Sequence, residues 1–218
     1  MTFVVFVVFN NFVAKKTFSI KEAVSYGWKK ATSRLLFFIL LFVIVAASSS
    51  LPSITAALID PQQGGVLIFI SQLAAWVIQI LISIGLINIA LRLYENKKTD
   101  YKDLFRRYQL IIPYFIASVI YSVIVVVGFI LFIIPGFVWA IKFRYFSYLM
   151  IDRNLGPIDA LKESGKITDG VKWKLLWFSL ALVGINILGA LALLVGLLVT
   201  VPLSMMAEVY VYKKLSDR

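Results

Sequence analysis

Long runs of apolar residues without charge constrain this chain more than any other feature. Several windows of about 20 residues lack Asp, Glu, Lys and Arg, and a helix of that length can cross the hydrocarbon core of a bilayer. Of the 218 residues, 61% are hydrophobic and only 15% are charged, a balance that soluble domains do not show. Strands of a membrane barrel would instead alternate over about 10 residues. The sequence therefore predicts an all-α polytopic membrane protein.

We expect six transmembrane helices, paired as three hairpins that form one membrane domain over residues 19–215. The expected spans are residues 35–57, 66–93, 110–134, 137–151, 175–195 and 197–212. Pro135 and Gly136 are expected to form a tight turn between the third and fourth spans, because Gly accepts positive φ. Residues 1–18 are expected to form an apolar N-terminal tail, with an additional membrane segment as the alternative reading of residues 1–13.

Each hairpin is expected to follow an amphipathic helix that lies in the cytoplasmic interface. These helices begin at Ile20, Tyr101 and Ile158, where apolar side chains recur at helical spacing with charged side chains opposite. Ser19 and Glu22 have the spacing of a capping box at the start of the first helix. Aromatic residues favour headgroup depth, which makes four of them the expected interfacial anchors. They are Trp28, Tyr101, Tyr108 and Trp173.

The distribution of basic residues predicts the orientation. The 22 Lys and Arg residues fall within residues 15–34, 92–107, 142–144, 153–174 and 213–218, and none lies in the three loops assigned to the opposite side. Cytoplasmic loops of membrane proteins are enriched in Lys and Arg. We therefore expect a multi-pass protein of the prokaryotic cytoplasmic (inner) membrane, with its N- and C-termini in the cytoplasm.

The absence of Cys and His excludes several kinds of chemistry. The chain can form no disulfide, no thiol nucleophile, no zinc site of the Cys/His kind and no imidazole acid–base pair. It also has no glycine-rich phosphate loop and no Ser/His/Asp set. We therefore expect no enzyme, no catalytic residue, no metal and no cofactor.

Apart from Arg92 at the end of the second span, three charged residues are expected within the spans, where an ionisable group is costly unless it is paired, reaches the interface or faces a cavity. Lys142 and Arg144 lie in the short fourth span, and Glu208 lies in the sixth. We expect Arg144 to pair with Glu208 and to link these two helices. The alternative is that Lys142 and Arg144 form a site for an anion or a lipid headgroup.

Uncharged polar residues also occur within the spans. Gln72 and Gln79 are seven residues apart and therefore share one helix face, and Asn186 lies among small residues of the fifth span. Such side chains form hydrogen bonds between helices or line a polar path. We expect helix contacts, with a substrate path as the alternative.

Several motifs resemble a large prokaryotic membrane family. They are FSIKEAVSYGWKK, IALRLYENKKTDYKDLF, IIPGFVWAIKFRYFSYLMID and GPIDALKESGKITDGVKWKLL. The family comprises uncharacterised six-helix proteins and is related to the membrane domain of glycerophosphoryl diester phosphodiesterases. The resemblance implies a six-helix bundle without an assigned activity. It supplies no catalytic residue, and the soluble phosphodiesterase activity is not expected.

These observations predict a membrane organiser or accessory subunit without catalytic machinery. The net charge of +11 indicates contact with anionic lipid headgroups rather than nucleic acid, because the charges lie beside membrane segments. A partner protein or a homo-oligomer is also expected at the basic cytoplasmic face. The alternative function is a small permease or lipid-handling transporter, with Lys142 and Arg144 at an anion or headgroup site.

Overall fold

The computed structural model describes residues 17–58, 61–192 and 195–217, and every regular element in them is helical. The α-helices are α2 (Ile20–Ser33), α3 (Leu35–Leu58), α4 (Pro61–Tyr94), α5 (Ile111–Leu131), α6 (Ile133–Phe143), α7 (Phe146–Arg153), α8 (Pro157–Ile167), α9 (Lys172–Leu191) and α10 (Leu197–Ser216). Two short 3-10 helices, η1 (Tyr101–Leu104) and η2 (Tyr108–Leu110), precede α5. The predicted all-α class is confirmed for these residues. The predicted tail lies outside them up to residue 16.

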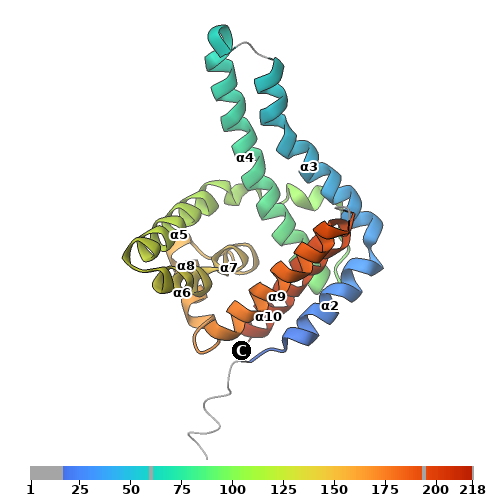
Figure 1. Cartoon of the computed structure of the whole chain (residues 1–218), viewed down its shortest axis with the longest axis vertical. Coiled ribbons are helices and arrows are strands. Elements are labelled where there is room, and N and C mark those ends of the chain that lie inside the picture. The colour runs from blue at the N-terminus through green and yellow to red at the C-terminus, as the bar shows by residue number, and fades with distance from the viewer. Residues whose placement is uncertain (1–16, 59–60, 193–194, 218) are drawn as a thin grey trace, which may run out of the picture.

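α10 is the central helix of the fold. It contacts α2, α3, α4 and α9, and most of its second half is buried (Figure 1). α2 lies along α10 through Ala23, Gly27 and Ala31, which recur every four residues and are buried. A Cβ atom on Gly27 would lie 2.4 Å from the carbonyl oxygen of Leu203, so the glycine allows the two backbones to approach closely. The side of α2 that was expected to face the membrane interface therefore packs against protein.

The hairpin of α3 and α4 extends beyond the other helices (Figure 1). Its outer half has no neighbour within the described residues that covers it, and large apolar side chains such as Val66, Phe69 and Ile70 are more than half exposed. A soluble protein rarely exposes so continuous an apolar surface, whereas lipid tails would cover it in a membrane. This exposed hairpin agrees with a membrane protein.

Four segments of the described residues are long and apolar enough to cross a membrane. They are Leu35–Ile54, Gly64–Tyr94, Tyr101–Leu131 and Lys172–Leu191. They overlap the predicted first, second, third and fifth spans. The predicted sixth span corresponds to α10, which does not meet this criterion because Glu208, Lys213 and Lys214 lower its hydropathy. The arrangement of six spans in three hairpins stays a prediction.

The predicted fourth span, residues 137–151, is wrong as a single helix. The chain forms α6 and α7 instead, separated by Arg144 and Tyr145. The tight turn predicted at Pro135 and Gly136 is also wrong, because both residues lie within the first turns of α6 and the chain reverses at the extended residue Phe132. Gly136 has a packing role: its Cα lies 3.0 Å from the position of a Cβ on Gly128, so α5 and α6 can touch.

The interfacial helix predicted from Tyr101 is shorter than expected. Residues 101–110 form η1 and η2 rather than one α-helix. Asp100 and Asp103 form a capping box at the start of η1. The Asp100 side chain accepts from the backbone amide of Asp103, and the Asp103 side chain accepts from the backbone amide of Asp100. The helices predicted from Ile20 and Ile158 are present as α2 and α8, and Ser19 caps α2 by accepting from the Glu22 amide at 3.3 Å.

Candidate functional site

The break between α6 and α7 positions Arg144, one of the charged residues of the predicted spans. Arg144 and Tyr145 separate the two helices, so the nearby backbone groups lose helical partners that they would need in a membrane. Ser164 of α8 provides new partners for these backbone groups. Its Oγ accepts from the Tyr145 amide and donates to the Lys142 carbonyl, both at 3.1 Å. Thr168 Oγ1 donates to the same carbonyl at 2.9 Å. Hydrogen bonds from α8 therefore stabilise the break.

Arg144 forms the expected ion pair with Glu208. Its Nη2 donates to Glu208 Oε1, and its Nη1 donates to the hydroxyl of Ser179 on α9. Tyr145, which is fully buried, donates its hydroxyl to Glu208 Oε2 at 3.3 Å. The side chains of Arg144 and Glu208 are only 20% and 17% exposed. The pair therefore joins the α6–α7 break to α9 and α10.

A cavity of about 530 Å³ lies beside this ion pair, between α4, α9 and α10. Arg144 and Glu208 line it together with four uncharged polar residues, and its other lining residues are apolar. The uncharged polar residues are Ser83, Ser179, Asn186 and Ser204. Asn186 donates to Ser204 Oγ at 2.9 Å, while its Oδ1 atom is buried without a hydrogen-bond partner in the described residues. The cavity can therefore accept an amphipathic molecule that carries a hydrogen-bond donor.

The other intramembrane polar residues do not join this cavity. Lys142 places its ammonium 5.1 Å from the centre of the Phe143 ring, and its side chain packs against Gly165 of α8. Gln79 donates to Ser49 Oγ of α3 at 2.9 Å, which agrees with the expected helix contact. Gln72 is exposed, and its side chain forms no hydrogen bond with a described residue. The structure thus brings together Arg144 and Glu208 but separates them from Lys142.

The expected interfacial anchors have different environments. Trp28, Tyr108 and Trp173 are 54%, 60% and 72% exposed, so their rings are free to contact headgroups. Tyr101 is half-buried and stacks on Phe37 of α3, with ring centres 5.0 Å apart. Tyr101 therefore contributes to packing between α3 and η1.

A charge network joins the C-terminal ends of α4, α7 and α10. Lys213 is 8% exposed and donates to Asp152 Oδ1 at 2.8 Å and to Glu95 Oε1 at 3.1 Å. Burial opposes the charge of Lys213, but these hydrogen bonds outweigh it and raise the Lys213 pKa. A hydrogen bond from Lys97, assisted by Lys213, lowers the pKa of Glu95. Both groups are therefore stabilised in their charged forms.

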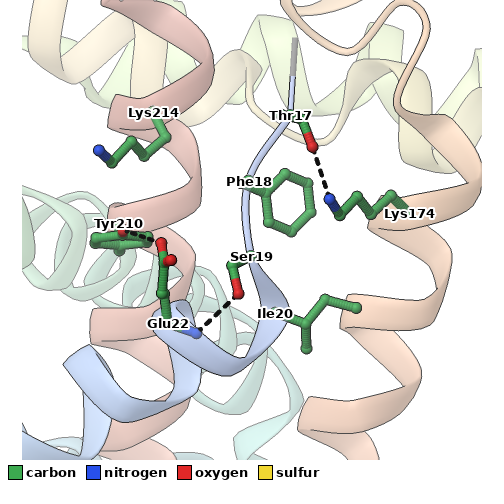
Figure 2. A pocket seen from close by; sticks show the side chains of 8 residues that line it. All are labelled: Thr17, Phe18, Ser19, Ile20, Glu22, Lys174, Tyr210 and Lys214. Carbon is green, nitrogen blue, oxygen red and sulfur yellow. Dashed lines mark hydrogen bonds between the residues drawn. The ribbon is translucent and has the colours of Figure 1, made fainter. Parts of the chain in front are cut away.

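A second cavity, of about 410 Å³, lies where the chain enters α2 (Figure 2). Lys174 of α9 and Lys214 of α10 contribute its positive charges, and Figure 2 shows them on either side of the chain entering α2. Lys174 donates to Thr17 Oγ1 at 2.7 Å. Glu22, the acidic residue in the lining, accepts from the Tyr210 hydroxyl at 3.1 Å. Neither lysine forms an ion pair with a described carboxylate.

Reasoning from the sequence missed Ser179 and Tyr145, the two other partners of the ion pair. Ser179 lies seven residues before Asn186, so a polar stripe on one face of α9 would have indicated it. No comparable signal indicated Tyr145, because it depends on the break after α6. Within the described residues, no cluster of three or more carboxylates could hold a metal ion.

The chain is similar to proteins whose functions have not been characterised. Residues 116–218, a little under half of the chain, match the family model described as a protein of unknown function, DUF975. The uncharacterized protein Rv2560 of Mycobacterium tuberculosis is 23% identical over 153 residues, which are 70% of this chain and 46% of that protein. The uncharacterized protein Mb2590 of Mycobacterium bovis gives the same identity and coverage.

The chain thus spans less than half of the length of these curated relatives. No solved structure matches it significantly. These similarities fit the expected resemblance to an uncharacterised prokaryotic family.

Proposed function

We propose that this chain is a non-enzymatic membrane organiser or accessory subunit that engages anionic lipid headgroups through its basic cytoplasmic face. We define this face by the basic residues of α2 and its C-cap, the loop after α4, the segment from η1 to η2, the end of α7, α8 and the ends of α9 and α10. The main support is an excess of basic side chains that have no ion-pair partner. The carboxylates Glu95, Asp103, Asp152, Glu163 and Asp169 are already in salt bridges.

The unpaired basic residues are spread over this face. Within the described residues, no ion pair is formed by Lys21, Lys29, Lys30, Arg34, Lys98, Lys102, Arg107, Arg153, Lys162, Lys174 or Lys214. Each basic residue near an anionic surface contributes about 1 kcal/mol to its attraction. Together they favour anionic lipid, or an acidic surface of a partner protein or a second copy.

Native mass spectrometry of the purified protein tests lipid engagement. With equal amounts of phosphatidylglycerol and phosphatidylcholine, we expect adducts of phosphatidylglycerol to dominate and to weaken as salt is raised. The triple variant K29Q/K102Q/K162Q should lose much of this preference, and K29R/K102R/K162R, which keeps the charge, should retain it. Equal adducts of the two lipids on the wild-type protein would refute the proposal.

The proposal places both termini and the basic face in the cytoplasm, with six spans in a prokaryotic inner membrane. The absence of Cys makes this directly testable, because single Cys residues can be introduced without background. A membrane-impermeant maleimide added to whole cells should label Q63C and should not label K98C until the membrane is opened. The reverse pattern would contradict the orientation.

A small permease or lipid-handling transporter is the second candidate function. The cavity beside Arg144 and Glu208 favours it, since transporters bind substrates among polar groups within the membrane. The separation of Lys142 from Arg144 weakens a shared anion site. Flux of anionic solutes or lipids into proteoliposomes that depends on Arg144 would support transport over the organiser role.

The relationship to the membrane domain of glycerophosphoryl diester phosphodiesterases stays a prediction. The matched family and relatives are themselves uncharacterised. The proposal therefore assigns no phosphodiesterase activity, catalytic residue or cofactor to this chain.

A further inference from the structure

A third cavity lies at the cytoplasmic end of α4, between the η1–η2 segment and the end of α7. It has a volume of about 260 Å³, and most of its lining is polar. Arg92 and Asn88 belong to the last turns of α4, which end a candidate membrane span. In a membrane, the end of a span lies at the depth of the lipid headgroups. The position of this cavity therefore suits a group at the headgroup level.

The charges of the lining favour an anion. Four basic residues (Arg92, Lys97, Arg106 and Arg107) and two acidic residues (Glu95 and Asp152) line the cavity, a formal excess of two positive charges. Both carboxylates are already in salt bridges: Lys213 lies 2.8 Å from Asp152 and 3.1 Å from Glu95, and Lys97 also pairs with Glu95. They are therefore poorly suited to attract a cation.

The guanidinium groups of the lining differ in how far they are already engaged. Asp103 holds two of them: its carboxylate oxygens lie 3.3 Å from Arg92 Nε and 3.5 Å from Arg106 Nη1. Despite this contact, Arg92 Nε is buried and lacks a hydrogen bond of good geometry. Arg107 is half-buried, and its guanidinium group forms neither an ion pair nor a hydrogen bond with any described residue. Among the guanidinium groups of the lining, that of Arg107 therefore has the most hydrogen-bond donors available to a ligand.

We propose that this cavity binds a phosphate monoester or free phosphate, with Arg107 as its principal ligand. A phosphate dianion matches the excess of two positive charges, and the planar guanidinium group of Arg forms paired hydrogen bonds with phosphate oxygens. A phosphodiester carries a single charge and matches the cavity less well. The lipid form of this ligand, phosphatidic acid, rests on the proposed function of the basic face, whereas inorganic phosphate would bind from the cytoplasm.

Two arms of one experiment separate these sources. In the lipid arm, native mass spectrometry compares adducts of phosphatidic acid and phosphatidylglycerol on the purified protein. In the soluble arm, calorimetric titration measures binding of inorganic phosphate to the protein in neutral detergent. The variants are R107Q, the conservative R107K, and Q109A as a control that truncates an exposed side chain of η2 outside the cavity.

We expect R107Q to weaken the binding affinity for the phosphate ligand about tenfold. This change corresponds to the loss of one charge-assisted pair of hydrogen bonds. R107K should have an intermediate effect, and Q109A should leave binding of the phosphate ligand unchanged. A preference for phosphatidic acid that depends on Arg107, without binding of inorganic phosphate, assigns the site to lipid. Binding of inorganic phosphate that depends on Arg107 assigns it to the soluble ion.

The proposed site is overturned if neither arm of the experiment shows binding that depends on Arg107. If adducts of phosphatidylglycerol still exceed adducts of phosphatidylcholine in that case, the proposed function stands and only the phosphate site is refuted. If the wild-type protein shows no preference for any anionic lipid, the proposed function fails independently. Elution of R107Q from size exclusion at the wild-type volume shows that this variant is folded. If R107Q does not elute there, the binding measurements are made on R107K instead.

Discussion

Replacing Glu208 by Gln removes the negative charge from the buried ion pair and keeps the shape of the side chain. Arg144 would then keep Ser179 as its hydrogen-bond partner but would lose the only carboxylate that contacts it among the described residues. The Tyr145 hydroxyl can still donate to the amide oxygen of Gln. The substitution therefore isolates the charge of Glu208 from its packing.

The expected loss of stability follows from the burial of both side chains. At a contact distance of about 3 Å and an effective dielectric constant of about 20, two unit charges attract by roughly 5 to 6 kcal/mol. Desolvation of the two groups offsets part of this attraction, yet removal of one partner leaves the other charge buried and costs about 3 to 5 kcal/mol. For a chain of this size, the midpoint of thermal unfolding should fall by on the order of 10 °C.

Loss of the monodisperse peak in size exclusion after heating in detergent measures this midpoint. E163Q is the matched control, because Glu163 forms an exposed ion pair with Lys166 and should contribute less than about 1 kcal/mol. The double variant R144M/E208L should recover most of the loss, since apolar replacement of a buried pair is often neutral. The reasoning is refuted if E208Q and E163Q shift the midpoint equally.

Three further predictions concern packing and pH. G27L should destabilise the protein by about 1 to 3 kcal/mol in the same heating assay, because a side chain there collides with α10, whereas G184L meets open space and should change little. N186L should cost about 0.6 kcal/mol, the usual value of one hydrogen bond between membrane helices. The folded-state pKa of Glu95 is lowered, so its contribution is present above its ordinary value of 4.5 and is lost as pH falls through the folded value. The thermal midpoint of E95Q should therefore depend less on pH than that of the wild-type protein below about pH 4.5, and an identical pH dependence would contradict this.

The pairing of Arg144 with Glu208 shows how far sequence reasoning reached into the candidate site. A charge within an apolar helix must be neutralised, and Glu208 is the one acidic residue in the predicted spans. Their pairing therefore followed from composition and position. Lys142 did not follow the same rule, because its backbone carbonyl and its side chain are held against α8 and directed away from Glu208.

The sequence by itself determined the helical class, the long apolar segments and the concentration of basic residues between them. These properties depend on periodicity and composition over one segment at a time. Only the tertiary structure decided that Ser164 and Thr168 stabilise a break after Lys142, that α2 packs on α10, and which basic residues line the small polar cavity. Each of these depends on contacts between segments far apart in the chain, and local periodicity carries no information about which segments meet.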